Sequence, residues 1–311
     1  MALRCKTAGA AALLALVLGS GCATGGAARS VSSIEAAVER AAQRCGCRMG
    51  IAARHLESGR SYEHNADDEF ESASVIKVAI LTQAMAEVRE NRVDLADRWT
   101  LTAQTKTSET GVLSLLDSGL QPTWNDLLTL MIGESDNTAA NAWIERLGIE
   151  NINARMASLG FPNTQLFSLL PWRDSNREGP RWSGFRFGQV TPRDVGDWMA
   201  RVAEGELLDA ESSRRIFEYL DKDASRLRIA RRFPPEFLWA GKTGSMRGVR
   251  NDTGILRTKK GRFVLVVLTD GSQAESANPA DHPSVLAIAD VARTIVDVWS
   301  RDLPDLTDRP K

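Results

Sequence analysis

The sequence predicts an α/β protein of the α+β kind, with one antiparallel sheet built from both ends of the chain and a lobe of helices between them. Strand patterns gather near the two ends, at residues 49–56, 60–64, 238–240, 249–257 and 261–270. Helical patterns fill most of the middle. One further amphipathic segment precedes the first strand and another follows the last, so helices from both termini would cover the sheet.

The terminal helices are predicted at residues 32–44, where Ser32 or Ser33 is a suitable cap, and at residues 283–299. The first two strands flank Glu57-Ser58-Gly59, which is typical of a hairpin turn. These segments place the start and the end of the chain in one layered unit.

The middle of the chain is a series of helices with recognisable ends. Thr123 opens a helix that runs to residue 132, with Asp126 at the capping-box position. Further helices are predicted at residues 137–147, 150–159, 193–204 and 211–220. Between residues 163 and 190 the periodicity fails, and a loop this long in a compact domain is usually functional.

Composition limits the kind of protein this is. The chain has 311 residues, of which 43% are hydrophobic and 25% are charged, and its net charge is −1. That length can bury a large core in one two-lobed domain or in two small ones. The near-neutral balance argues against nucleic-acid binding, because no basic excess is available to neutralise phosphates.

The first residues are typical of a targeting segment. Arg4 and Lys6 precede an apolar run, residues 8–18, that is too short to span a bilayer comfortably. The small residues Gly19-Ser20-Gly21 come directly before Cys22, which predicts a bacterial lipoprotein lipidated on Cys22. Gly19 stands where a leucine is usual, and the alternative is an ordinary cleaved signal peptide in which Cys22 has no role.

These features divide the chain into expected parts. Residues 1–22 are the signal peptide, 23–31 a flexible tether, 32–303 the folded domain, and 304–311 a tail. Within the domain we expect a sheet lobe, residues 32–72 and 237–303, and a helical lobe, residues 73–236. We expect an exported bacterial protein, periplasmic or anchored in the membrane as a lipoprotein.

Two cysteines, Cys45 and Cys47, remain in the folded part. We expect them to form no disulfide, because a Cys-x-Cys pair cannot easily reach disulfide geometry without backbone strain. A metal site with His55 or His64 is the alternative, but one cysteine pair without a second is a weak zinc signal.

The most informative stretch lies around Ser74. From Val75 to Met85 nearly every side of a helix would be apolar, which predicts a buried helix. Lys77 is out of place there, because a buried ammonium costs several kcal/mol unless it is paired or becomes neutral. Ser74 lies three residues earlier, on the same face and at the helix start, so a hydroxyl nucleophile would have a base in reach. The alternative is that Ser74 only caps the helix and Lys77 reaches solvent.

Two other motifs support the catalytic interpretation. Ser135-Asp136-Asn137 follows an apolar run, and Lys242-Thr243-Gly244 follows a strand-like segment. Ser-x-x-Lys, Ser-Asp-Asn and Lys-Thr-Gly in this order are the signature of class A β-lactamases and penicillin-binding proteins. From residue 48 to residue 299 the chain therefore resembles a class A β-lactamase-type serine hydrolase of the serine β-lactamase and DD-peptidase-like fold.

The resemblance implies a role for each motif residue. Ser74 is the nucleophile and Lys77 its base, while Ser135 relays a proton to the departing nitrogen. The backbone N–H groups of Ser74 and Ser245 form the oxyanion hole. Lys242 supplies positive potential near Ser135 and the substrate carboxylate.

Further residues are expected to bind the substrate. Thr243 and Gly244 lie beside Lys242, and Asn137 would hydrogen bond the substrate amide. Arg250 is a candidate for a bidentate clamp on the substrate carboxylate; the alternative is a surface salt bridge. Asp136 is expected to be structural, holding the turn that presents its neighbours.

One feature departs from the class A pattern. Those enzymes carry a Glu-x-x-Asn pattern on the long loop, which positions the water that hydrolyses the acyl-enzyme. Between residues 163 and 191 this chain has no such pattern, and its only glutamate there is Glu178. Glu178 is either the water base or a solvated loop residue. Without a base the enzyme would still be acylated but would release the product slowly, as penicillin-binding proteins do.

Three functions therefore stay open. The first is β-lactam opening through an acyl-enzyme on Ser74. The second is a D-alanyl-D-alanine peptidase, or a related cell-wall amidase or esterase, that β-lactams inhibit. The third is a non-catalytic protein that binds muropeptides, against which the presence of all four catalytic side chains argues. The resemblance implies no metal or organic cofactor, no nucleic-acid partner, membrane contact only through the lipid, and a monomer.

Overall fold

The protein is built on a five-stranded sheet that joins the two ends of the chain. The structure, a computed structural model, describes residues 23–107, 110–170, 185–223, 225–274 and 278–306, with side chains from residue 31 onward. All neighbouring strands are antiparallel. Their order across the sheet is β2 (Arg60–His64), β1 (Arg48–His55), β8 (Gly261–Asp270), β7 (Val249–Thr258) and β6 (Leu238–Met246). The predicted fold class is confirmed.

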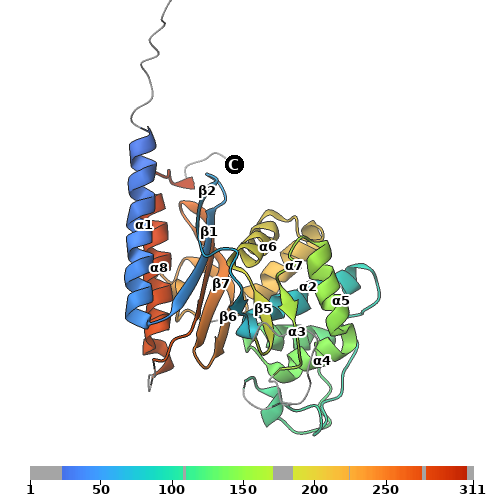
Figure 1. Cartoon of the computed structure of the whole chain (residues 1–311). Coiled ribbons are helices and arrows are strands. Elements are labelled where there is room, and N and C mark those ends of the chain that lie inside the picture. The colour runs from blue at the N-terminus through green and yellow to red at the C-terminus, as the bar shows by residue number, and fades with distance from the viewer. Residues whose placement is uncertain (1–22, 108–109, 171–184, 224, 275–277, 307–311) are drawn as a thin grey trace, which may run out of the picture.

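Helices from both termini cover one face of this sheet. α1 (Ala23–Cys45) and α8 (Pro283–Ser300) lie side by side on it (Figure 1). The buried core between these helices and the sheet includes Ile34, Val38, Ile51, Leu265, Ile288 and Trp299. A sheet that is apolar on both faces is expected to be covered by other elements on both sides.

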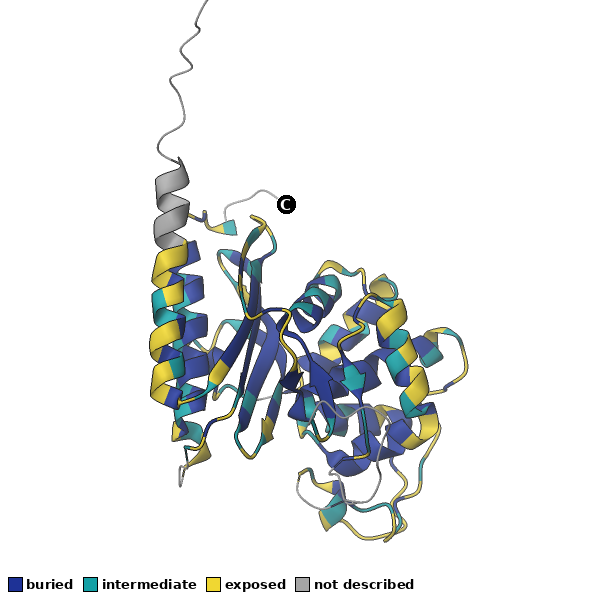
Figure 2. Cartoon of the chain, in the orientation of Figure 1, coloured by how far each residue is buried: buried dark blue, intermediate teal, exposed yellow. Residues whose placement is uncertain are grey.

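The other face of the sheet carries the helical lobe. α6 (Pro192–Glu204) packs on β1, β7 and β8, where Gly196 allows a close approach to Ala52. Behind it lies α2 (Lys77–Arg89), which is buried over most of its length (Figure 2). Around α2 stand α3 (Trp124–Gly133), α4 (Asn137–Leu147), α5 (Ile149–Ser158) and α7 (Ala210–Leu220).

The helix ends follow the predicted chemistry. Thr123 and Asp126 form the reciprocal capping box at the start of α3, as expected. The shorter helical turns are η1 (Ala73–Ile76), η2 (Leu113–Leu115), η3 (Ile229–Arg232) and η4 (Pro279–Asp281).

The long loop between α5 and α6 is anchored at its two ends by a small second sheet. Its strands are β3 (Phe70–Glu71), β5 (Gly188–Val190) and β4 (Gln165–Leu166), in that order. Strands of two or three residues give no periodic pattern, so the sequence did not predict this sheet. Glu178 lies outside the described residues.

Two expectations about the N-terminal region were wrong. The segment 23–31 is part of α1 and not a tether: no proline separates it from the amphipathic helix, and extending an existing helix costs less than starting a new one. Cys45 and Cys47 form a disulfide, which also contradicts a metal site on their thiols. Gly46, at φ 55°, turns the backbone so that the two Cα atoms lie 5.2 Å apart, within the usual disulfide range.

Candidate active site

Ser74 lies in the short helical turn η1, directly before α2. The turn begins at Ala73, which lies in the left-handed region at φ 43°, an unusual conformation for a residue with a side chain. The N–H of Ser72 donates to the carbonyl of Gly188, which ties the turn to β5. Ser74 is half-buried and lines a cavity of about 280 Å³.

Lys77 is fully buried and its amine faces Ser74. Nζ lies 3.3 Å from Ser74 Oγ and donates to Ser135 O at 2.6 Å, Ser135 Oγ at 3.1 Å and Asn137 Oδ1 at 2.8 Å. Burial, assisted by the positive charge of Lys242, lowers the Lys77 pKa well below its ordinary 10.5, and Asp136 opposes the shift. The alternative in which Lys77 reaches solvent is therefore wrong.

The turn between α3 and α4 presents Ser135 and Asn137. Ser135 has a positive φ of 53°. Asp136 is buried and accepts from the N–H groups of Val112 and Leu113, both at 2.8 Å, and of Ala139 at 2.9 Å. These contacts agree with the structural role that we expected for Asp136.

Lys242 projects from β6 into the same region. We expected Lys242 to lie after the end of a strand, which was wrong. β6 continues through the whole Lys-Thr-Gly motif to Met246 and stays in register with β7. Burial lowers the Lys242 pKa, while Asp223, with Oδ2 3.8 Å from Nζ, raises it. No sequence motif pointed to Asp223 as a partner of Lys242.

Gly244 lets β6 approach the nucleophile closely. A Cβ at this position would lie 2.9 Å from Ser72 O and 3.2 Å from Ser74 N, closer than such contacts normally are. The next residue, Ser245, lines the cavity together with Ser74, Ala73 and Asn137. The two residues predicted to form the oxyanion hole thus meet in one cavity.

Two arginines lie near this end of β6, and the sequence pointed only to one. The Arg250 guanidinium donates to Met246 O at 2.6 Å and Val249 O at 2.7 Å, so it holds the β6–β7 turn. Arg228, which sequence reasoning missed, is buried and donates to Gly244 O at 2.8 Å, to Asn251 O and to Ser245 Oγ.

The start of the long loop forms another wall of the cavity. Leu170 is buried and lines the cavity with Ser74 and Asn137. Asn141 holds the Leu170 backbone at both polar atoms: Oδ1 accepts from Leu170 N at 2.7 Å and Nδ2 donates to Leu170 O at 2.6 Å. The Leu170 backbone is therefore fixed at a place where the loop contributes an apolar residue to the cavity wall.

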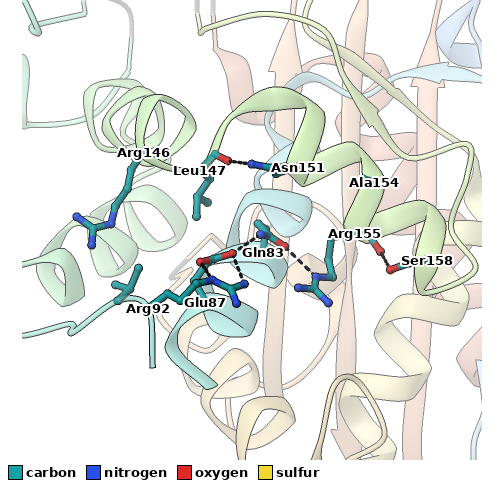
Figure 3. A pocket seen from close by; sticks show the side chains of 10 residues that line it. Gln83, Glu87, Arg92, Arg146, Leu147, Asn151, Ala154, Arg155 and Ser158 are labelled. Atoms are coloured by element: carbon teal, nitrogen blue, oxygen red, sulfur yellow. Dashed lines mark hydrogen bonds and ion pairs between the residues drawn. The ribbon is translucent and has the colours of Figure 1, made fainter. Parts of the chain in front are cut away.

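A second, larger hollow lies between α2, α4 and α5 and shares no lining residue with the Ser74 cavity (Figure 3). Its volume is about 660 Å³. Arg92 is paired with Glu87 at 2.5 Å, and Arg155 with Glu90 at 3.0 Å. The guanidinium groups of Arg92 and Arg155 therefore already have carboxylate partners, while Arg146 lies over the Trp124 ring.

Comparison with known proteins agrees with the geometry. A sequence model described as "Beta-lactamase enzyme family" matches residues 32–299. The chain is 29% identical to a β-lactamase of Streptomyces albus G, over 94% of both chains. Its fold resembles the crystal structure of a β-lactamase from Sphaerobacter thermophilus, with a TM-score of 0.78 and 30% identity over 88% of this chain and 99% of that one. It also resembles a structure titled PBP-A, with a TM-score of 0.75 and 25% identity over 87% of this chain and 96% of that one.

Proposed function

Because the chain belongs to the beta-lactamase enzyme family and is a class A β-lactamase-like serine hydrolase, we propose that it opens β-lactam rings through an acyl-enzyme on Ser74. The observation that carries the proposal is the contact between the buried Lys77 amine and the hydroxyl groups of Ser74 and Ser135. Burial lowers the pKa of the Lys77 amine, so it loses its proton more readily than an exposed lysine and can then accept one from Ser74.

In the acylation step Ser74 Oγ attacks the lactam carbonyl carbon while its proton moves to Lys77 Nζ. The N–H groups of Ser74 and Ser245 stabilise the oxyanion, each donor being worth about 3 kcal/mol. When the tetrahedral intermediate collapses, the C–N bond breaks and the nitrogen takes the proton of Ser135. Ser135 recovers a proton from Lys77, whose Nζ lies 3.1 Å from its Oγ.

The substrate carboxylate would bind at the β6 end of the cavity. Lys242 and Thr243 were predicted there, and Arg228 adds a buried positive charge beside Gly244 and Ser245. Both arginines donate to main-chain carbonyls, but Arg228 also donates to the side chain of the cavity-lining Ser245, so we prefer Arg228 to Arg250 for this role. Asn137, which lines the cavity, would contact the substrate amide.

A second function is favoured by one observation, the side chain of Leu170. An alkyl group cannot activate water, so the cavity wall that faces Ser74 would leave the acyl-enzyme long-lived. A D-alanyl-D-alanine peptidase, or a related cell-wall amidase or esterase, behaves in this way towards β-lactams, and the likeness to PBP-A supports this alternative. Lys77 Nζ lies within hydrogen-bonding distance of Ser74 Oγ, and Lys242 Nζ lies 3.8 Å from Asp223 Oδ2. Both lysines of the catalytic motifs are thus present and held in place, which argues against a non-catalytic muropeptide-binding protein.

Intact-mass spectrometry with a penicillin tests the proposal, with Ser74→Ala as control. We expect a covalent adduct on the wild-type chain and none on the variant. An adduct that persists for hours would favour the peptidase alternative, and one that disappears within seconds would establish a β-lactamase. An adduct that survives Ser74→Ala would refute the assignment of the nucleophile.

We also propose that the protein is exported as a monomer and lipidated on Cys22. Among the described residues no helix is both long and apolar enough to cross a bilayer. The Cys45–Cys47 disulfide supports an oxidising compartment. Membrane fractionation with the variant Cys22→Ser tests the anchor, since the variant should move to the soluble fraction; gel filtration tests the monomer.

A further inference from the structure

Glu71 is a buried carboxylate three residues before the nucleophile, and no motif includes it. It lies on β3 with 6% of its surface exposed. Oε2 accepts from the N–H of Arg186 at 2.6 Å, and Oε1 accepts from the N–H of Phe187 at 3.3 Å. Both donors belong to the exit of the long loop, where they line the Ser74 cavity.

The carboxylate is stabilised by main-chain groups. Burial raises the Glu71 pKa, whereas the backbone N–H groups of Arg186, Phe187, Gly188 and Ala73 lower it. In the described part of the chain no lysine or arginine forms an ion pair with Glu71. A buried carboxylate without a cation partner is costly unless several N–H groups solvate it, so the site is organised around these donors.

The donors come from two sides of the cavity. Arg186 and Phe187 belong to the loop exit, and Ala73 belongs to the nucleophile turn, where it takes its left-handed φ of 43°. The large sheet holds the backbone of residues 71 and 72 as well. Asn251 Nδ2, on β7, donates to Glu71 O at 2.8 Å and to Ser72 O at 3.2 Å. The stretch before Ser74 is thus fixed from both directions.

We propose that Glu71 is a positioning residue that holds the loop exit at Arg186–Phe187 and the Ala73–Ser74 turn in one arrangement. Its carboxylate keeps Ser74 Oγ in line with Lys77 and keeps the Ser74 N–H directed into the cavity. A misplacement of this turn would reduce acylation, because the reaction depends on the alignment of nucleophile, base and oxyanion hole. This proposal rests on the proposed function, since it concerns the same acylation step.

The test compares Glu71→Gln with the matched variant Glu69→Gln. Glu69 is an exposed carboxylate two residues away, which accepts from the Gln189 side chain at 2.9 Å and touches no main-chain donor of the loop exit among the described contacts. In Glu71→Gln one acceptor oxygen is replaced by an amide NH₂, which points at an N–H group. We expect the second-order rate of penicillin acylation, followed by intact mass, to fall at least tenfold in Glu71→Gln and to stay within twofold in Glu69→Gln.

Hydrogen exchange of the loop-exit amides gives a readout that does not depend on activity. We expect the amides of residues 186–188 to exchange faster in Glu71→Gln and unchanged in Glu69→Gln. If Glu71→Gln does not fold, Glu71→Asp keeps the charge but withdraws it by one methylene, and the same two measurements apply. Equal acylation rates in wild type and the folded Glu71 variant would overturn the proposal, as would equal slowing in Glu69→Gln. If the wild-type chain forms no adduct at all, the proposed function fails, and the exchange of residues 186–188 still decides whether Glu71 holds the loop.

Discussion

Leu170→Glu should speed the hydrolysis of the acyl-enzyme on Ser74. Leu170 is 3% exposed and lines the Ser74 cavity, and Asn141 binds its backbone at 2.7 and 2.6 Å. The side chain can therefore change while the backbone keeps its place. A carboxylate at this position would face the ester bond on Ser74 and could activate a water molecule for its hydrolysis.

The substitution should change two quantities, the rate of deacylation and the stability of the fold. A positioned general base accelerates a proton transfer by roughly 10²–10⁴-fold, so we expect deacylation to rise at least about 100-fold, which is about 2.7 kcal/mol of the barrier. The stability cost is at least the lost burial of the leucine, about 1.5–3 kcal/mol, because the new carboxylate is desolvated as well. For a domain of this size the loss of leucine burial alone lowers the melting temperature by about 3–6 °C.

The assay is the decay of the penicillin adduct after free penicillin is removed, followed by intact mass. Leu169→Glu is the matched control, because Leu169 is the adjacent leucine, is 37% exposed and does not line the cavity. We expect the control to decay at the wild-type rate and to lose at most about 0.5 kcal/mol of stability. If Leu170→Glu forms the adduct normally but releases it no faster than Leu169→Glu, Leu170 is not what limits turnover.

Three other measurements follow from the charges around the cavity. The acylation rate should rise with pH as the Lys77 amine loses its proton, and should level off well below pH 10.5, because burial and Lys242 lower the Lys77 pKa; a rise that continues to pH 10.5 would contradict this. Arg228→Ala should raise the KM of a penicillin at least tenfold with a smaller effect on kcat, whereas Arg250→Ala should not, and the reverse result would assign the carboxylate to Arg250. Burial raises the Asp252 pKa from 3.8 to about 7. Between these two pH values the native state holds a proton that the unfolded chain has released. The free energy of unfolding should therefore fall as pH rises through this interval, by at most about 4 kcal/mol. In Asp252→Asn this decline should be absent in urea unfolding at pH 5 and pH 8; an equal decline in both proteins would mean that another group causes it.

The fold could be predicted because its periodic elements are long. β7 and β8 each have ten residues, β8 includes an apolar run from Phe263 to Leu268 that is typical of a buried strand, and the cap of α3 is visible in the sequence. The three motifs are also local patterns, so they identified the residues that the structure brings together around Ser74.

The residues that sequence reasoning missed have partners that no local pattern encodes. Arg228 binds carbonyl groups of β6 and β7, and Glu71 binds N–H groups more than a hundred residues away. Backbone partners have no residue-type signature, so a single Arg or Glu in a short segment looks like any other surface charge. The missing Glu-x-x-Asn pattern was visible, but only the structure shows that Leu170 lies in the cavity wall.

The pairing of β1 with β8 has a consequence for how the protein is made. Arg48 on β1 pairs with Asp270 on β8, 222 residues later, so the central part of the sheet cannot form until almost the whole chain has been synthesised. Contacts this distant in sequence slow folding, because a long stretch of chain must close before they form. Lys242 and Ser245, on β6, join the nucleophile only when that sheet assembles. A newly made chain therefore stays without a complete sheet or active site through most of its synthesis, so delayed folding of this kind would be compatible with the export that we propose.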